Sequence, residues 1–221
     1  MTTAIIVAAG KSERMGAGVD KAFLPLCNKP VLAWSLLAFE RSNEIDNIIL
    51  VVRKDQLAAA QALCKMFGIS KIFKIVPGGK TRAESVKCAL QECDIDVKYV
   101  LIHDGARPLV SKNLISEVVK AVAKGPVAVG KRVTDTIKKV EKGVVVSETV
   151  KRDKLFAVQT PQAFSFREID EAYRNLGKCE VTDDAQVIEN AGGTVRILES
   201  NEPNFKITTA EDLQLVAMFL K

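Results

Sequence analysis

Positively charged side chains follow a short apolar run near the start of the chain. Residues 4–9 have the sequence AIIVAA, and the loop after them carries Gly10, Lys11, Arg14 and Lys21. An apolar run that is β-branched in its middle and is ended by glycine predicts a buried strand. Glycine lets the backbone approach a ligand closely, and the cations add positive charge. A strand, a glycine loop and cations in this order predict a site for polyanionic phosphates. The simplest alternative is a tight turn whose charges are solvated.

This loop matches neither of two common phosphate-binding motifs. Residues 10–16 lack the Gly-x-x-x-x-Gly-Lys-Ser/Thr pattern of a Walker loop, and they lack the Gly-x-Gly-x-x-Gly pattern of a dinucleotide site. The strand predicted at 47–52 is followed by Arg53, where a dinucleotide-binding fold needs an acidic residue. The sequence therefore argues against a hydride-transferring enzyme and predicts a phosphate-binding loop of another type.

A second group of reactive side chains lies where another buried strand is expected to end. Residues 102–108 have the sequence IHDGARP. An Asp at this place can hold Mg²⁺, which prefers one or two carboxylates together with substrate phosphates. Arg107 can bind a phosphate through two parallel hydrogen bonds, although it could instead simply pair with Asp104. We expect Asp104 to be functional and His103, the single histidine of the chain, to be a core residue.

Strand and helix patterns alternate along the first part of the chain. Strands are predicted at 4–9, 47–52, 71–76, 97–103 and 127–130, and helices at 30–39, 56–66, 81–92 and 111–124. Such alternation predicts an α/β fold with a mostly parallel, Rossmann-like twisted sheet and helices on both faces. Right-handed crossovers then bring the loops after Ala9, Val76 and His103 to one edge of the sheet. Because all three loops carry glycines and charges, we expect a single site there.

The last third of the chain is expected to complete the same sheet. Residues 155–162 should return to the core, followed by helices at 166–175 and 182–190 and strands at 194–198 and 204–207. Residues 208–212 offer two overlapping capping boxes for a final helix. We find no linker, repeat or low-complexity segment, and we expect residues 1–221 to form a single domain.

Residues 131–151 have a different pattern, which predicts an arm. Apolar and polar residues alternate over 133–140 and 144–150, and Glu141-Lys142-Gly143 supplies the turn of a β-hairpin. Because an isolated hairpin is marginally stable in water, this arm should pack on something else. The simplest partner is the same arm of a second subunit, which predicts a homodimer, and the alternative is a hairpin folded back on its own sheet.

Composition excludes several classes of protein. The net charge of +5 is mild, and aromatic residues are only 5% of the chain, so single-stranded nucleic acid would find few stacking platforms. A single histidine excludes a His-rich zinc site, and an odd number of cysteines (five) argues against a closed disulfide framework. We find no signal segment and no long apolar run. We therefore expect a soluble cytoplasmic protein that binds neither nucleic acid nor membrane.

Two stretches resemble a known enzyme family. Residues 8–15 (AAGKSERM) with Lys21 resemble the loop with which nucleotidylyltransferases of sugar and polyol phosphates wrap a triphosphate. Residues 102–108 are more specific, since they match the signature of the 2-C-methyl-D-erythritol 4-phosphate cytidylyltransferase family. Segments similar to its other motifs follow in the same order: Gly78-Gly79-x-x-Arg82-x-x-Ser85, Arg152, Thr160-Pro161-Gln162, Thr182-Asp183 and Lys206-Ile207-Thr208. One departure is Asp20, where the family usually has proline before the loop lysine.

The resemblance implies a role for each matching residue. The enzyme would transfer CMP from CTP to 2-C-methyl-D-erythritol 4-phosphate, a step of the non-mevalonate isoprenoid pathway, with Mg²⁺ as cofactor. Arg14, Lys21 and Lys206 would be catalytic. The nucleotide would be bound by Ala8, Ala9, Gly10, Lys11, Gly79, Ser85 and Asp104. The acceptor would be bound by Asp104, Gly105, Arg107, Thr136, Arg152, Thr160, Thr182 and Asp183, with Thr136 and Arg152 reaching across a dimer. Asp104 would also hold the metal.

The implied chemistry fits the residue types. A phosphate nucleophile is already ionised at neutral pH, so no general base is needed, and catalysis rests on positioning and on neutralising charge. One alternative is a ribitol 5-phosphate cytidylyltransferase or a related sugar-phosphate nucleotidylyltransferase, but residues 82–85 and 105–107 favour methylerythritol phosphate. Another is a nucleotide-binding regulatory protein without turnover. The intact set of Arg14, Lys21, Asp104 and Lys206 argues against it.

Overall fold

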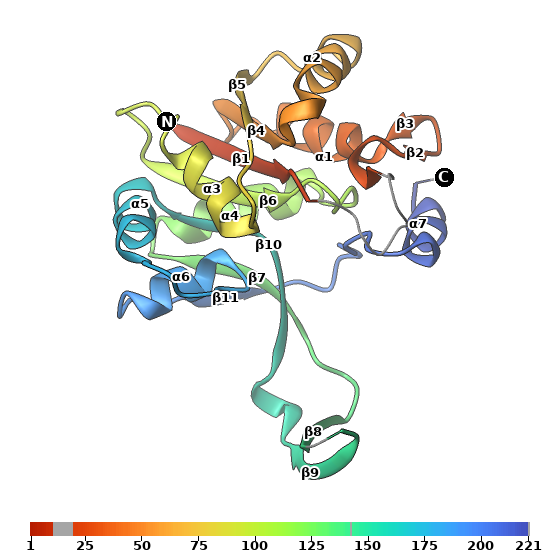
Figure 1. The fold of residues 1–221 in the computed structure, drawn as a ribbon, viewed down its shortest axis with the longest axis vertical. Helices are drawn as coiled ribbons and strands as arrows, with labels where there is room; N and C mark the ends of the chain where they lie inside the picture. Colours follow the sequence, from red (N-terminus) through yellow and green to blue (C-terminus); the bar gives the residue numbers. More distant parts are fainter. Residues whose placement is uncertain (11–19, 142, 221) are drawn as a thin grey trace.

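A seven-stranded sheet forms the centre of the protein in the computed structural model, which describes residues 1–10, 20–141 and 143–220 (Figure 1). The strand order is β11-β7-β10-β6-β1-β4-β5, and β10 is antiparallel to both of its neighbours, whereas the other neighbouring strands run parallel. The strands are β1 (Thr2–Ala8), β4 (Asn47–Val52), β5 (Ile72–Pro77), β6 (Tyr99–Asp104), β7 (Val127–Arg132), β10 (Phe156–Ser165) and β11 (Arg196–Glu199). The predicted α/β fold with a mostly parallel sheet is confirmed.

Helices cover both faces of this sheet because alternate residues of the buried strands are apolar on both sides. On β1, Ile6 packs into the cluster that includes α1, α2 and α4, whereas Ile5 packs into the cluster that includes α3, α5 and α6. Both side chains are fully buried, as expected for a strand inside a parallel sheet. The helices are α1 (Val31–Glu40), α2 (Leu57–Met66), α3 (Arg82–Leu90), α4 (Lys112–Val122), α5 (Phe166–Asn175), α6 (Asp184–Asn190) and α7 (Ala210–Ala217).

Side-chain caps fix where several of these helices begin. Thr81 accepts a hydrogen bond from the Glu84 N–H at 3.0 Å and starts α3 directly after the β5 loop. The Glu84 carboxylate bonds the Lys80 N–H at 2.6 Å, so the predicted reciprocal box is only half formed. At α7 the box is complete between Thr209 and Asp212. Since each cap satisfies backbone donors that a helix leaves open, α3 is anchored at the edge of the sheet where the site was predicted.

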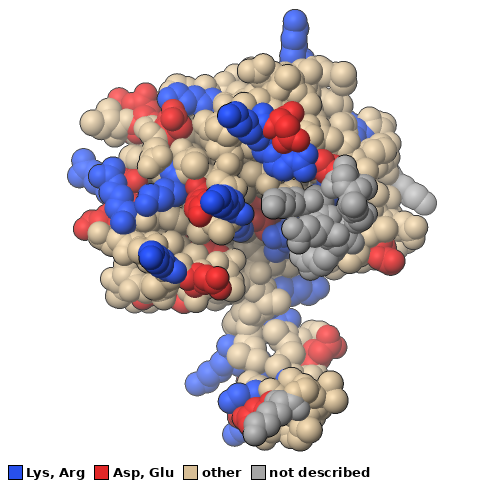
Figure 2. All heavy atoms as spheres, viewed as in Figure 1, with Lys and Arg blue, Asp and Glu red and all other residues tan. Residues whose placement is uncertain are grey.

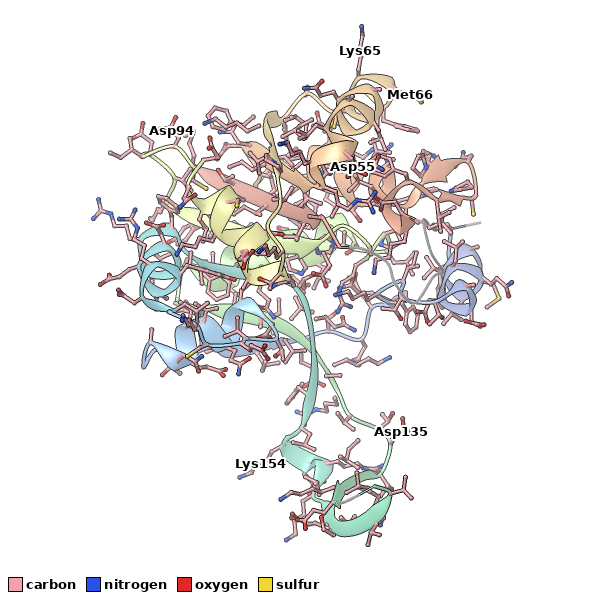
Figure 3. All side chains as sticks on the ribbon, in the orientation of Figure 1. Asp55, Lys65, Met66, Asp94, Asp135 and Lys154 are labelled. Carbon is pink, nitrogen blue, oxygen red and sulfur yellow. The ribbon has the colours of Figure 1, made fainter. Side chains whose placement is uncertain are left out.

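The predicted arm is a separate two-stranded sheet, formed by β8 (Ile137–Glu141) and β9 (Val145–Val150). Figure 1 shows it projecting away from the body, and it is not folded back on the central sheet. Asp135 and Lys154, labelled in Figure 3, lie on this projection, well apart from Lys65 and Met66 on α2. The arm exposes four valines to solvent: Val140, Val144, Val145 and Val146.

Several details differ from the predicted elements, including the helix predicted over 111–124, which ends at Val122, and the helix predicted from 182, which begins at Asp184. Residues 204–207 were expected to form a strand, but they form none, because the Asn204 carbonyl accepts from the Arg107 side chain and only the Ile207 N–H bonds the Ala106 carbonyl nearby. The helix predicted over 81–92 ends at Leu90. A further small sheet joins β2 (Pro25–Leu26) and β3 (Lys29–Pro30). Within the described ranges, no helix has the length and apolar character needed to cross a membrane.

Candidate active site

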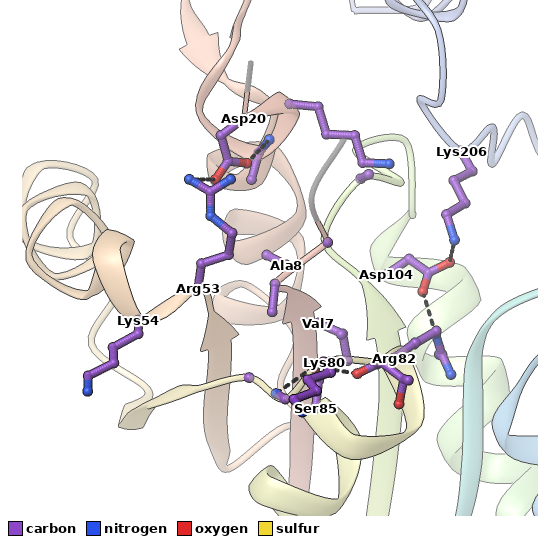
Figure 4. Close-up of a pocket in the computed structure, with 18 residues that line it drawn as sticks. Val7, Ala8, Asp20, Arg53, Lys54, Lys80, Arg82, Ser85, Asp104 and Lys206 are labelled. Atoms are coloured by element: carbon purple, nitrogen blue, oxygen red, sulfur yellow. Dashed lines mark hydrogen bonds and ion pairs between the residues drawn. The ribbon is translucent and has the colours of Figure 1, made fainter. Parts of the chain in front are cut away.

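A pocket of about 320 Å³ lies at the carboxyl ends of β1, β4 and β5, and we call it the first pocket (Figure 4). The three loops whose convergence was predicted do meet here. Backbone and small side chains from the end of β1 and from the loop after β5 line one part, and the rest is lined mainly by positively charged side chains together with the carboxylates of Asp20 and Asp104. Its lining comprises Val7, Ala8, Ala9, Gly10, Asp20, Lys21, Ala22, Arg53, Lys54, Gly78, Gly79, Lys80, Thr81, Arg82, Ser85, Asp104, Ala106 and Lys206.

The loop after β5 is tightly packed, which explains its glycines. A Cβ atom on Gly78 would lie 2.4 Å from the Ala9 Cβ, and one on Gly79 would lie 2.3 Å from the Glu84 Cβ. The Ser85 hydroxyl accepts from the Gly79 N–H at 3.1 Å and donates to the Thr81 carbonyl at 2.8 Å. Ser85 is therefore the residue that holds this turn in shape beside the first pocket.

A second pocket, of about 290 Å³, lies on the other side of Asp104. It is lined mainly by side chains from β10 and from the start of α6, and its polar groups bond to one another. Gln162 donates to the Asp183 carboxylate at 2.9 Å, and Asp183 also caps α6 by accepting from the Gln186 N–H. The lining comprises Arg82, Asp104, Arg107, Val158, Gln159, Thr160, Gln162, Thr182, Asp183 and Lys206.

Three residues, Arg82, Asp104 and Lys206, line both pockets and form the wall between them. The Asp104 carboxylate contacts Lys206 Nζ at 2.9 Å, Arg82 Nε at 3.1 Å and Arg107 Nε at 3.4 Å. Figure 4 shows Lys206 and Arg82 approaching it from different sides. Burial alone would raise the pKa of Asp104, but the charges of its three partners hold this pKa far below the usual range. Asp104 is thus anionic, and it holds the side chains of Lys206, Arg82 and Arg107 close to one another.

The positive charge of the site is local. In the view of Figure 2, basic and acidic side chains are interspersed over the body of the molecule. Lys206, Arg82 and Arg107 are instead gathered around the buried Asp104 carboxylate. Such an arrangement suits a compact, highly charged ligand such as a phosphate group.

His103 lies next to Asp104 in the protein interior and lines neither pocket. It is fully buried, and its pKa is lowered to about 3, mainly because burial disfavours the charged ring. Its Nε2 lies 3.2 Å from the Arg107 carbonyl, which can only accept, so Nε2 carries the proton. Its Nδ1 then accepts from the Thr160 hydroxyl at 3.1 Å, and that hydroxyl accepts from the Asp104 N–H at 3.0 Å. The prediction that His103 is a core residue agrees with this geometry.

Comparison with known proteins identifies the family. The family model for 2-C-methyl-D-erythritol 4-phosphate cytidylyltransferases matches residues 2–221. The chain belongs to this family.

Individual relatives agree with the family model along the whole chain. A 2-C-methyl-D-erythritol 4-phosphate cytidylyltransferase from Bacillus cereus is 42% identical over 223 residues, covering 100% of this chain and 98% of its own. One from Alkaliphilus metalliredigens is also 42% identical and covers 96% of this chain and 89% of its own. The crystal structure of the 4-diphosphocytidyl-2C-methyl-D-erythritol synthase from Anaerococcus prevotii superposes with a TM-score of 0.88 at 32% identity, over 99% of this chain and 95% of that one.

Most residues that the family resemblance nominated lie around the two pockets. Those in the first pocket are Ala8, Ala9, Gly10, Lys21, Gly79, Ser85, Asp104 and Lys206, and those in the second are Asp104, Arg107, Thr160, Thr182, Asp183 and Lys206. Lys11 and Arg14 lie outside the described residues. Gly105 lies beneath the pockets: its N–H bonds the Val7 carbonyl, and an added Cβ would lie 3.1 Å from the Ala8 Cβ. Gly105 therefore allows close packing of β6 on β1.

Thr136 directly precedes β8 and Arg152 follows β9, so the two flank the hairpin, and they line neither pocket of their own chain. Both are exposed, and the Arg152 guanidinium donates to the Thr134 carbonyl. The structure therefore does not bring these two predicted acceptor residues together with the others in either pocket of the same chain.

Several site residues are not among those predicted from the sequence. Arg82, which belongs to the wall, bonds to the buried Asp184 carboxylate, and Asp184 in turn accepts from the Tyr173 hydroxyl. Arg53 and Asp20, which both line the first pocket, pair at 3.7 Å. Asp20 also accepts from the Ala22 N–H at 3.1 Å, which starts the short 3₁₀ turn Lys21–Phe23. The carboxylate in place of the family proline thus orients the turn that carries Lys21. Burial raises the pKa of Asp20 in spite of these contacts.

The donor set limits how a divalent cation could bind. Among the described residues, no group of three or more His, Cys, Asp or Glu side chains is close enough to hold a metal. Asp104 is the one carboxylate shared by both pockets, and it is already surrounded by three cations. A Mg²⁺ ion fits beside it only if phosphate oxygens supply most of the ligands and offset the positive charge.

Proposed function

We propose that this protein transfers CMP from CTP to 2-C-methyl-D-erythritol 4-phosphate and releases pyrophosphate, as its family and its relatives' names indicate. The observation that carries the proposal is the pair of pockets that share a wall of Arg82, Asp104 and Lys206. Two substrates that meet at a phosphate need two adjoining pockets with cations between them. CTP would occupy the first pocket and the polyol phosphate the second.

The reaction needs charge neutralisation more than proton transfer. An oxygen of the acceptor phosphate forms a bond to the α-phosphorus, the bond to the bridging α,β-oxygen breaks, and its electrons leave with pyrophosphate. Lys206 lies where the two anionic groups must approach, and Lys21 lines the first pocket on the triphosphate side. Their charges offset the repulsion, most strongly in the transition state. No general base is required, in keeping with a His103 that is neutral and hydrogen-bonded on both nitrogens.

We further propose that Mg²⁺ enters together with the nucleotide. Bound to phosphate oxygens, with Asp104 as the nearest protein carboxylate, it would neutralise the triphosphate and stabilise the leaving pyrophosphate. Before CTP binds, three cations beside Asp104 oppose a divalent ion. Calorimetry should therefore detect no Mg²⁺ binding to the protein alone and clear binding in the presence of CTP. Tight Mg²⁺ binding without nucleotide would contradict this order.

We also propose that two chains pair through their arms, in the cytoplasm. Four exposed valines on an isolated hairpin favour a partner surface. Thr136 and Arg152, which line neither pocket of their own chain, would then serve a pocket of the second copy. All five cysteines are free thiols, which is typical of a reducing compartment.

A pyrophosphate-release assay tests the function directly. Purified protein is incubated with each of CTP, UTP, ATP and GTP, and with methylerythritol 4-phosphate or ribitol 5-phosphate as acceptor. We expect efficient turnover only with CTP and methylerythritol phosphate. Turnover of ribitol phosphate without turnover of methylerythritol phosphate would overturn the proposal. CTP binding without pyrophosphate release would instead indicate a binding protein.

A further inference from the structure

Arg82 occupies an unusual place between the two pockets. It is the first residue of α3, it lines both pockets, and its side chain is 25% exposed. Two carboxylates hold its guanidinium from different sides: Nε donates to Asp104 at 3.1 Å and Nη2 donates to Asp184 at 2.7 Å. Nη1 takes part in neither contact. An arginine has five donor hydrogens in a fixed fork, so this grip leaves donors that can face the pockets.

Asp184 is a fixed anchor for this arginine. Its side chain is fully buried, and its second oxygen accepts from the Tyr173 hydroxyl at 2.6 Å. Its N–H donates to the Gln162 side-chain oxygen at 3.0 Å, which ties the start of α6 to β10. A buried carboxylate is costly unless it is paired and hydrogen-bonded, and this one is satisfied on both oxygens.

The electrostatics keep the guanidinium charged. Burial by itself would lower the pKa of Arg82, but the carboxylates of Asp184 and Asp104 outweigh it and raise this pKa. The carboxylate of Asp184 similarly adds to burial in raising the pKa of Tyr173, so the hydroxyl remains a donor. Arg82, Lys206 and Arg107 together place three cations against the carboxylates of Asp104 and Asp184. This cluster of five side chains therefore keeps a net positive charge for an incoming phosphate.

We propose that Arg82 is a further catalytic residue, donating to phosphate oxygens where the two pockets meet, and that Asp184 and Tyr173 are positioning residues that hold its guanidinium there. This inference rests on the proposed function. A purely structural ion pair would enclose the arginine on all sides, whereas Arg82 borders both cavities. Because two of its nitrogens are already hydrogen-bonded, the Arg82 guanidinium loses little conformational entropy when it binds a phosphate. Its remaining donors are therefore preorganised for the transition state.

The test is a double-mutant cycle on steady-state kinetics. Arg82→Gln should lower kcat by about 10²–10³-fold, the effect of removing one well-aimed donor. The dissociation constant for CTP, measured calorimetrically without acceptor, should change less than about threefold, because differential binding to the transition state raises kcat alone. Tyr173→Phe should lower kcat by about tenfold, since it removes a charge-assisted hydrogen bond that orients the Asp184 carboxylate.

The decisive readout is additivity. If Tyr173 acts through Arg82, the double variant Arg82→Gln with Tyr173→Phe should be no slower than Arg82→Gln alone. Multiplying effects would show that Tyr173 acts independently and would overturn its positioning role. Wild-type kcat in Arg82→Gln would overturn the catalytic role. Arg174→Gln and Tyr99→Phe, which change residues outside both pockets, are the matched controls and should keep wild-type kinetics.

Two further measurements keep the outcome clear. Melting temperatures of all variants are compared, and if Arg82→Gln unfolds early, Arg82→Lys replaces it, since it retains the charge but loses the planar fork. Arg82→Lys with wild-type kcat would count against the inference. The wild type serves as the reference for the proposed function: absence of turnover with CTP and methylerythritol phosphate contradicts that function, whereas turnover that survives loss of Arg82 contradicts only the role of Arg82.

Discussion

The first and second pockets are built in different ways. In the first pocket, backbone and small residues at the ends of parallel strands make the surface, and glycines permit the close approach of loop and strand. The second pocket is made by side chains from β10, the start of α6 and the segment at 204–207, which bond to one another before any ligand binds. The first is shaped by local chain geometry and the second by long-range packing.

The wall of Arg82, Asp104 and Lys206 borders both pockets. Lys206 and Asp104 lie 2.9 Å apart although they are far apart in sequence, and each borders both cavities. Substitutions within one pocket should therefore affect one substrate, whereas substitutions in the wall should affect the chemical step itself. The following experiments test this division.

Lys206→Ala should have the largest effect. Removal of a cation at the wall should lower kcat by about 10²–10³-fold, because its charge matters most when two anionic groups meet in the transition state. Folding should persist, since the side chain is 36% exposed. Lys54→Ala is the matched control, a lysine that lines only the first pocket, and it should change kcat by less than about threefold. Equal losses of kcat in the two variants would contradict a special role for the wall.

Arg152→Ala extends the comparison to the arm. If Arg152 binds the acceptor phosphate of another copy, its loss should lower kcat/KM for the acceptor by about 10–100-fold, as for a hydrogen bond to a charged group. Mixing this variant with Lys21→Ala should restore activity to about a quarter of the wild type, because random pairing leaves one intact site in half of the dimers. Absence of any restoration, with subunit exchange verified by mass spectrometry, would contradict a shared site.

Gly79→Ala and Thr182→Val should separate the two pockets. A Cβ on Gly79 would clash with Glu84 and shift the turn, so we expect KM for CTP to rise by about tenfold at unchanged acceptor KM.

Thr182→Val keeps the side-chain shape but removes a hydroxyl that lines the second pocket, and acceptor KM should rise by about 2–10-fold at unchanged CTP KM. Initial rates over a grid of both substrates measure each constant, and a shared response would contradict separate pockets.

The contrast between the pockets also explains what could be predicted from the sequence. The sheet and the first pocket follow from local signals: the β-branched run of β1, the glycines at 78–79 and the cap at Thr81 act within a few residues of where they stand. Their convergence follows from the topology of parallel strands. In the acceptor site, Asp104 and Arg107 could be nominated from their residue types and their place after a buried strand, whereas Thr136, Arg152, Thr160, Thr182 and Asp183 could be nominated only through family resemblance.

What the sequence could not reveal depends on contacts between distant segments. Arg82 lies in a recognisable motif, but its partner Asp184 is a hundred residues away and resembles an ordinary helix-capping residue. Residues 204–207 were predicted as a strand because their pattern fits one. In the structure the Arg107 side chain donates a hydrogen bond to the Asn204 carbonyl, in place of a neighbouring strand. Side-chain networks of this kind override the local secondary-structure propensity, and residue spacing in the sequence does not predict them.

The smallest expected effect concerns His103, which supports the wall without touching a substrate. Its pKa is about 3 in the folded protein, against an ordinary value of 6.5, so the unfolded chain binds the extra proton as pH falls through this window. The free energy of unfolding should therefore decrease, by up to about 1.4 kcal/mol per pH unit below the ordinary value.

His103→Gln isolates this contribution, because glutamine keeps hydrogen-bonding groups but does not titrate. Urea unfolding from about pH 7 down to about pH 5 stays above the range in which Asp104 and most other carboxylates take up protons. The wild type should lose stability more steeply than His103→Gln over this interval. Equal dependence of the free energy of unfolding on pH in the two proteins would mean that the His103 imidazole is protonated in the folded state. This would contradict a neutral His103 beside Asp104.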